Sequence, residues 1–292
     1  MGGFHFMVLR TGRGLLWLSI LLSPAPSAAQ EEPRAERYHL RPAVDIPVLL
    51  LAGAAWGAPR FFLDDLVDPS CPCDPSEVHG LDRWSIDHHS DRLDLVSDVG
   101  MGAVIATPFL LDALAADGSR EGWVRFAEDA VVMGESALVS GALTQLTKLL
   151  VERPRPHLYG REPGDPELQI EENYLSFPSS HVSTVFALGL SAARTYRLHH
   201  PGGRHVPAVY GTAIGAGATM GVVRVLAGHH FTSDVLAGAA IGSAAGIVIP
   251  WLHTRTDRTR VGLSGSPRAG LVVRVTIEGG NVDYGRASSG TR

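Results

Sequence analysis

The sequence predicts an all-α fold: a bundle of about six helices, associated with a membrane, with its active site at one end. Apolar segments of helix length, rich in Ala and Gly, recur along the chain and show no strand-like alternation. Charged residues make up only 19% of the 292 residues, against about 25% in an average soluble protein. The segments are residues 44–58, 98–116, 130–150, 182–197, 206–228 and 234–253.

The N-terminus has the order of a secretory signal. Arg10 and Arg13 precede the apolar run LLWLSILL, and small residues follow up to Ala29. We therefore expect residues 1–29 to be a signal peptide that is cleaved near Ala29. An uncleaved anchor helix is the alternative, although the run holds only about half of the ~20 apolar residues that a span needs.

The rest of the chain is expected to divide into three parts. An N-terminal segment with a polar loop covers residues 30–95, the helical bundle covers 96–253, and a tail covers 254–292. The tail contains LVVRVTIEG, whose alternation is typical of one β-strand.

The two cysteines, Cys71 and Cys73, lie in the polar loop. Export permits a disulfide, but partners two residues apart would form a strained ring. A metal site needs more ligands than this pair offers. We expect the cysteines to shape the loop and assign no chemistry to them.

Membrane association rests on two uncharged runs, Val206–Val223 and Val235–Leu252, each about as long as the 18 residues of a transmembrane candidate. A soluble periplasmic bundle is the alternative. The positive-inside rule places the basic loop 194–205 in the cytoplasm, and therefore the opposite helix ends in the periplasm. A cleaved signal followed by six spans would place those ends inside, so segment 44–58 is predicted not to cross.

Three polar clusters fall at helix ends that an up-and-down bundle brings to one side. The first closes the segment 130–150, the second opens 182–197, and the third joins 206–228 to 234–253. The clusters contain Lys148, Arg153 and Arg155; Ser176, Ser179, Ser180 and His181; and Arg224, His229, His230 and Asp234. Their convergence follows from connectivity alone.

The residue types in these clusters fit a phosphoryl group. Lys148, Arg155 and Arg224 supply cations, and the guanidinium fork matches phosphate oxygens. Ser179 and the backbone N–H groups that begin the next helix, including that of Ser180, form a natural anion site.

Two histidines can divide the remaining chemistry. One attacks phosphorus, while the other protonates the leaving oxygen and later activates water. His230 and Asp234 are four residues apart, so on a helix the carboxylate can fix the imidazole tautomer. The pair His199–His200 falls at the opposite end and is interpreted as part of a turn. Glu135, in the middle of a helix, is interpreted as a structural partner.

Three spacings occur in order: Lys-x6-Arg-Pro at 148–156, Pro-Ser-x-His at 178–181 and Arg-x5-His-x3-Asp at 224–234. They resemble the motifs of the type 2 phosphatidic acid phosphatase superfamily, which includes bacterial acid phosphatases and vanadium haloperoxidases. The resemblance covers roughly residues 95–253. It implies hydrolysis through a phospho-histidine, without a metal or other cofactor. By motif position it implies His230 as nucleophile, His181 as acid, Asp234 as orienting carboxylate, and Lys148, Arg155, Ser179 and Arg224 as phosphate ligands.

The sequence departs from that family at two positions. Ser180 stands where the family usually has Gly, which would be unfavourable if the turn required a positive φ. Val223 stands where the family usually has Ser. Losing one phosphate-contacting donor costs on the order of tenfold to a thousandfold in rate.

The leading functional hypothesis is a periplasm-facing phosphatase of a lipid phosphate, with the membrane and a phosphorylated lipid or small phosphoester as partners. The alternatives are a soluble periplasmic acid phosphatase, a vanadate-dependent haloperoxidase and a non-enzymatic helical membrane protein such as a transporter. A transporter would scatter polar residues at membrane depth, whereas here they gather at one end. The net charge of -5, with no basic run, does not support a nucleic-acid partner.

Overall fold

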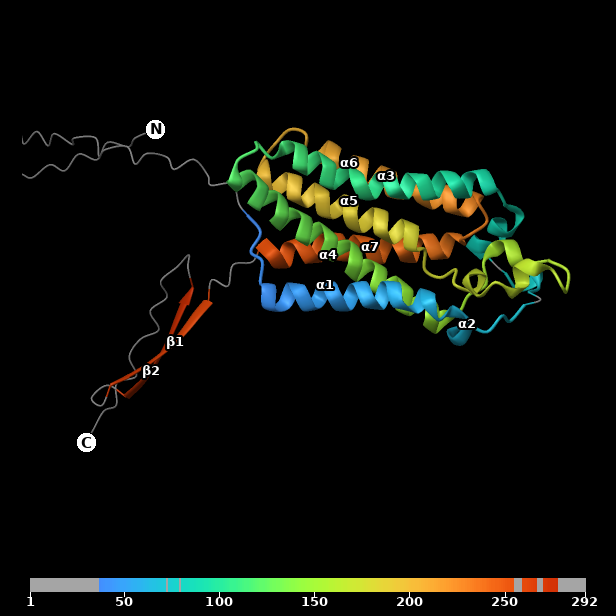
Figure 1. Ribbon diagram of the computed structural model, residues 1–292, viewed down its shortest axis with the longest axis horizontal. Coiled ribbons are helices and arrows are strands. Elements are labelled where there is room, and N and C mark those ends of the chain that lie inside the picture. Colours follow the sequence, from blue (N-terminus) through green and yellow to red (C-terminus); the bar gives the residue numbers. More distant parts are fainter. Residues whose placement is uncertain (1–36, 72, 79, 255–258, 267–269, 278–292) are drawn as a thin grey trace, which may run out of the picture. The chain divides into compact units, whose positions relative to one another are not determined.

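The computed structural model describes residues 37–71, 73–78, 80–254, 259–266 and 270–277. Six long helices lie side by side in a bundle, which confirms the predicted fold class (Figure 1). They are α1 (Pro42–Gly57), α3 (Asp91–Ala115), α4 (Arg120–Val151), α5 (Ser180–His199), α6 (Val206–Leu226) and α7 (Thr232–Thr254). The predicted signal peptide, residues 1–29, lies outside the described residues.

Local chemistry sets several helix ends. The side chains of Ser90 and Ser119 accept hydrogen bonds from Leu93 N and Gly122 N, and so cap the first turns of α3 and α4. Glu152 follows the last residue of α4 as its C-cap and adopts a left-handed conformation with φ 46°. This ending places the residues that follow Glu152 in a loop, where two arginines of the first polar cluster lie.

Helix α5 lies at the centre and packs against α4, α6 and α7. On α7, Gly238, Gly242 and Gly246 face the carbonyls of residues 179, 183 and 187 so closely that a Cβ would overlap them. Small residues at four-residue spacing therefore let the two backbones approach directly.

One end of the bundle carries the short elements, and we call it the loop end (Figure 1). These elements are α2 (Leu63–Leu66), η1 (Ala58–Phe61), η2 (Pro75–Glu77), η3 (Gly80–Asp87), η4 (Pro156–Leu158), η5 (Pro166–Gln169) and η6 (Glu171–Tyr174). Two loops meet at this end, one between α1 and α3 (residues 58–90) and one between α4 and α5 (residues 152–179). They share a core in which Val67 packs with Leu158 and Tyr174. Cys71 and Cys73 form a disulfide, although sequence reasoning gave this ring little weight.

Helix α1 runs along the bundle from the opposite end to the loop end. Near its start, His39 N donates to His253 O at 2.9 Å, at the end of α7. Near its end, the Trp56 ring packs over Gly141 of α4. With η1 the helical stretch covers Pro42–Phe61, which is 20 residues and long enough to cross a membrane. Its length therefore does not exclude a crossing, and the prediction that segment 44–58 does not cross stays a prediction.

The chain is a membrane protein with several apolar helices. Four helical stretches have the length and composition of membrane spans: Pro42–Phe61, Asp91–Ala115, Val206–Leu226 and Thr232–Thr254. The uncharged runs of the sequence indicated only two of these four stretches. Leu51, Leu114 and Leu236 on three of these helices are more than half exposed, as expected for side chains that face lipid.

The tail forms a two-stranded antiparallel hairpin, described here by itself. Strand β1 (Thr259–Ser266) pairs with β2 (Gly270–Ile277). The alternating run predicted one strand, and that run is β2. Its partner β1 contains two glycines and a serine-rich stretch, which gave no alternation signal.

Candidate active site

The three polar clusters meet at the loop end. Arg155 Nη1 lies 2.9 Å from His229 Nδ1, which joins the first cluster to the third. Ser176 Oγ donates to Asp234 Oδ2 at 2.5 Å, which joins the second to the third. The end of α4, the start of α5, the end of α6 and the start of α7 therefore surround one site.

His230 is buried at the centre of this site, with 2% of its surface exposed. Its Nδ1 lies 3.7 Å from Asp234 Oδ2, close enough for attraction but too far for a hydrogen bond. Burial, together with the charges of Lys148, Arg224 and Arg155, holds the pKa of His230 well below its usual value. The imidazole is therefore neutral at physiological pH, which leaves a nitrogen lone pair available.

Asp234 is fixed from several sides. Its Oδ2 accepts from Ser176 Oγ and from Phe231 N at 2.8 Å. Its Oδ1 accepts from Arg153 Nη1 at 2.6 Å. These bonds set the carboxylate opposite His230.

Arg153 is a residue whose role sequence reasoning missed. Besides Asp234, its guanidinium contacts Ser233 Oγ at 2.7 Å and Asp82 Oδ2 at 2.9 Å. It also stacks over the Phe231 ring, with 3.9 Å to the centroid. The side chain thus connects the loop after α4, the loop before α3 and the start of α7. The only sequence signal for a role of Arg153 is its position two residues before Arg155.

The three predicted cations are buried and only partly paired. Lys148 Nζ donates to the Leu175 carbonyl. Arg155 Nη2 donates to Glu172 at 3.2 Å, and Arg224 Nη1 donates to Asp94 at 2.6 Å. The Nε atoms of both arginines are buried without a hydrogen-bond partner among the described residues. Burial lowers the pKa of Arg155, but an arginine stays charged at neutral pH.

Helix α3 supplies two acids that sequence reasoning also missed. Asp94 Oδ1 lies 3.2 Å from His229 Nε2 in addition to its pair with Arg224. Asp98 Oδ1 lies 3.0 Å from His181 Nε2. His229 itself stays neutral, because burial and then the charges of Arg155 and Arg224 lower its pKa to about 2.

The start of α5 differs in part from expectation. Ser179 N donates to the Asp234 carbonyl at 3.0 Å, so this N–H is not free for an anion as predicted. Ser179 Oγ, in contrast, is buried and has no hydrogen-bond partner in the part of the chain that is described. Among the described non-glycine residues only Glu152 has a positive φ, so Ser180 begins the helix without the strain considered above.

Fold and site together define a membrane protein with a buried, cationic centre built around a neutral histidine. The chain belongs to the PAP2 superfamily. The family model of that superfamily matches residues 129–258.

Two relatives and one solved structure extend this comparison. Decaprenylphosphoryl-5-phosphoribose phosphatases of two Mycobacterium tuberculosis strains, CDC 1551 and H37Rv, are each 30% identical over 154 residues. The match covers 52% of this chain and 72% of each relative. A transmembrane PAP2 type phosphatidylglycerolphosphate phosphatase from Bacillus subtilis aligns with a TM-score of 0.40 and 20% identity. That alignment covers 72% of this chain and 94% of the other.

Proposed function

We propose that this PAP2-family phosphatase hydrolyses a lipid phosphate through a phospho-histidine on His230. One observation carries the proposal. Arg155 Nε, Arg224 Nε and Ser179 Oγ, one from each motif, are buried without hydrogen-bond partners among the described residues. A buried polar atom without a partner costs about 1–3 kcal/mol, so three such atoms in the clusters that meet at the loop end favour a polar ligand there. Two of the three are cationic, which makes that ligand an anion.

The reaction divides between two histidines. His230 Nε2 attacks phosphorus while Nδ1, which faces Asp234, keeps its proton. The bond from phosphorus to the leaving oxygen breaks, and His181 gives that oxygen a proton. Burial and then the charges of Arg224 and Lys148 lower the pKa of His181 to about 3, so His181 takes up this proton when the anionic substrate offsets those cations. His181 then takes a proton from water, the hydroxide attacks the phospho-histidine, and inorganic phosphate leaves with His230 neutral again. Asp98, 3.0 Å from His181 Nε2, orients the acid.

Two observations favour a lipid over a soluble phosphoester. The site lies at one end of a bundle that has four potential membrane spans. The two M. tuberculosis relatives are named for a polyprenyl-linked phosphoribose, which is a phosphomonoester on a lipid carrier. A soluble acid phosphatase would not need the exposed leucines on α1, α3 and α7.

Phosphate release from a substrate panel tests the substrate class. We expect kcat/KM at least about tenfold higher for phosphatidic acid or a polyprenyl-linked sugar phosphate than for an aryl phosphate, because binding energy from the chain aids the reaction. Vanadate should inhibit competitively, since it mimics the five-coordinate transition state. EDTA in the assay should leave the rate unchanged.

Three results would contradict this assignment. Equal kcat/KM on lipid and aryl phosphates would favour the soluble-substrate alternative. Strong inhibition by EDTA of protein that stays folded, reversed by a divalent ion, would indicate metal chemistry. Halide oxidation by vanadate-loaded protein and peroxide, without phosphate release, would indicate a haloperoxidase.

The loop end faces the periplasm in this proposal. The loop between α5 and α6, at the opposite end, holds Arg204 and follows Arg194 and Arg197 in the last turns of α5. The positive-inside rule places the basic loop in the cytoplasm. The Cys71–Cys73 disulfide, at the loop end, is typical of an oxidising compartment. Because α1 begins at the opposite end, this orientation conflicts with a leader cleaved after export.

Thiol labelling tests the orientation. In cells stripped of outer membrane, a reagent that cannot cross membranes should label Cys71 and Cys73 after mild reduction. A Cys71→Ser, Cys73→Ser double variant is the control for background labelling. Labelling of the wild type only after lysis would place the loop end in the cytoplasm and reverse the proposed orientation.

A further inference from the structure

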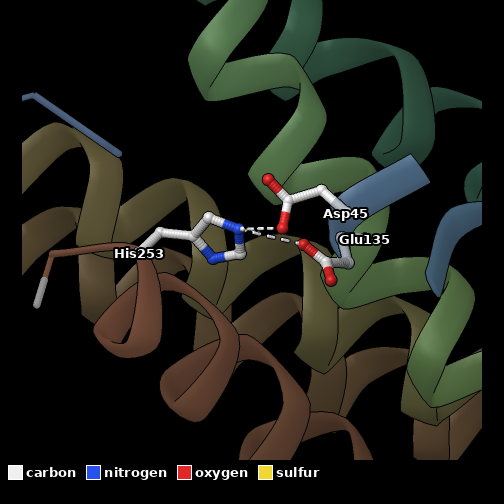
Figure 2. A group of neighbouring side chains, drawn as sticks. All are labelled: Asp45, Glu135 and His253. Atoms are coloured by element: carbon white, nitrogen blue, oxygen red, sulfur yellow. Dashed lines mark ion pairs between the residues drawn. The ribbon is translucent and has the colours of Figure 1, made fainter. Parts of the chain in front are cut away.

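Three buried ionisable side chains meet at the end of the bundle opposite the loop end. Figure 2 shows Asp45 from α1, Glu135 from α4 and His253 from α7, with the imidazole directed at both carboxylates. His253 Nε2 lies 3.2 Å from Glu135 Oε2 and 3.5 Å from Asp45 Oδ1. One donor atom from each residue can be chosen so that all three lie within 4.8 Å of one another. Each residue is at most 4% exposed.

The hydrogen bonds around His253 determine which nitrogen carries a proton. Nδ1 lies 2.9 Å from the Ile249 carbonyl, which can only accept, so Nδ1 holds a hydrogen. In a neutral imidazole, Nε2 then presents its lone pair to two carboxylate oxygens. Glu135 Oε2 and His253 Nε2 both lack a hydrogen-bond partner within the described ranges. In that protonation state three electron-rich atoms face one another, and a cation between them would satisfy all three.

The local charge is unbalanced in the same way. No lysine or arginine of the described residues forms an ion pair with Asp45 or Glu135. Apart from His253, the contact given for the Asp45 carboxylate within the described residues is a hydrogen bond from Arg41 N, a neutral backbone group. A protonated His253 would leave one buried negative charge, and an uncompensated buried charge is costly. A divalent cation beside a neutral imidazole leaves none.

We propose that Asp45, Glu135 and His253 bind a divalent transition-metal ion of the Zn²⁺ type. Ligands at 2.0–2.1 Å from a tetrahedral ion lie about 3.4 Å apart. The separations of His253 Nε2 from the two carboxylates, 3.2 and 3.5 Å, agree with this spacing. One imidazole and two carboxylates suit zinc or its first-row neighbours better than calcium, which prefers oxygen ligands alone. The Nδ1–H bond to a backbone carbonyl is the usual orienting contact of a metal-bound histidine.

The ion would join three helices and take no part in hydrolysis. His253 lies in the last turn of α7, and Asp234 lies in the first. The 23 residues of α7 span about 34 Å, so the ion and His230 are at opposite ends. Asp45 lies in the first turn of α1, so a cation can enter from the aqueous side. Glu135, interpreted from the sequence as a structural partner, becomes a ligand.

Metal analysis of the full chain, purified in detergent without a histidine tag, tests the proposal. After growth with zinc, we expect about one equivalent of Zn²⁺ per chain. Stripped protein should bind Co²⁺ with visible absorption bands. Adding Zn²⁺ at a hundredfold excess over its Kd should raise Tm by about 5 °C or more. Wild-type protein that holds no metal and shows no shift would overturn the proposal, whether or not any variant folds.

Variants separate this site from adventitious binding. Glu135→Gln keeps the shape but removes the charge, and should weaken Zn²⁺ binding at least about a hundredfold. Its hydrolysis at a permissive temperature should stay within about twofold of wild type. Asp129→Asn is the matched control, because Asp129 lies on the same helix, is buried and pairs with His199 at 2.7 Å. Equal binding by Glu135→Gln and wild type would contradict the assignment.

Discussion

Replacing His230 with alanine is expected to lower kcat/KM by about four orders of magnitude or more, because the covalent step loses its nucleophile. Trapping with labelled substrate should yield an acid-labile phospho-histidine in the wild type and none in the variant. His200→Ala is the control, since His200 is exposed at the end of α5 farthest from the site. Its rate should equal that of wild type.

Unchanged hydrolysis by His230→Ala would remove the nucleophile assignment. The thermal stability of the variant must also be measured, because His230 is fully buried and its loss leaves a cavity. A folded and inactive variant supports the mechanism. A folded variant that still forms the phospho-histidine places the nucleophile on another histidine, and His229 is then the nearest candidate.

Replacing Arg153 with alanine should destabilise the protein by about 3–5 kcal/mol, since it leaves Asp234 buried and unpaired. Asp234 is fully buried, whereas the Arg153 side chain is about a quarter exposed. In a thermal unfolding experiment this loss corresponds to a drop in Tm of more than about 6 °C. Turnover should fall as well, because the carboxylate that faces His230 loses a fixed partner.

Arg161→Ala is the matched control for Arg153→Ala. Arg161 pairs with Asp165 at 2.7 Å, four residues away, and its side chain is about as exposed as that of Arg153. The partner carboxylate differs, because Asp165 is reached by water whereas Asp234 is fully buried, so the Asp165 pair should contribute much less to stability. Equal losses of Tm in the two variants would show that the contacts of Arg153 stabilise no more than a surface ion pair does.

The sequence predicted the position of the site because that prediction needs only connectivity. Helix ends that alternate along an up-and-down bundle bring Lys148, His181 and His230 to one side whatever the packing details. The acids Asp94 and Asp98 could not be found in this way. They lie on α3, outside the three spacings, and only the packing of α3 against α5 and α6 brings them to His181 and Arg224.

The length of α1 was underestimated for a local reason. Pro47 falls inside the helix, and Pro59 follows its end, so the uncharged stretch reads as short and interrupted. In the structure a 3-10 turn over Ala58–Phe61, with Pro59 near its start, continues directly from α1 and lengthens the helical stretch. The packing of α1 against α4 then stabilises a helix that propensity alone disfavours.

The three glycines of α7 that face α5 carbonyls have a mechanical consequence. The two backbones touch at 238 and 179, at 242 and 183, and at 246 and 187, so neither helix can slide past the other by less than a full turn. Asp234 and His181 belong to these two helices. A thicker or thinner bilayer can therefore tilt the two helices together, but it cannot change the distance between Asp234, the proposed orienting carboxylate, and His181, the proposed acid.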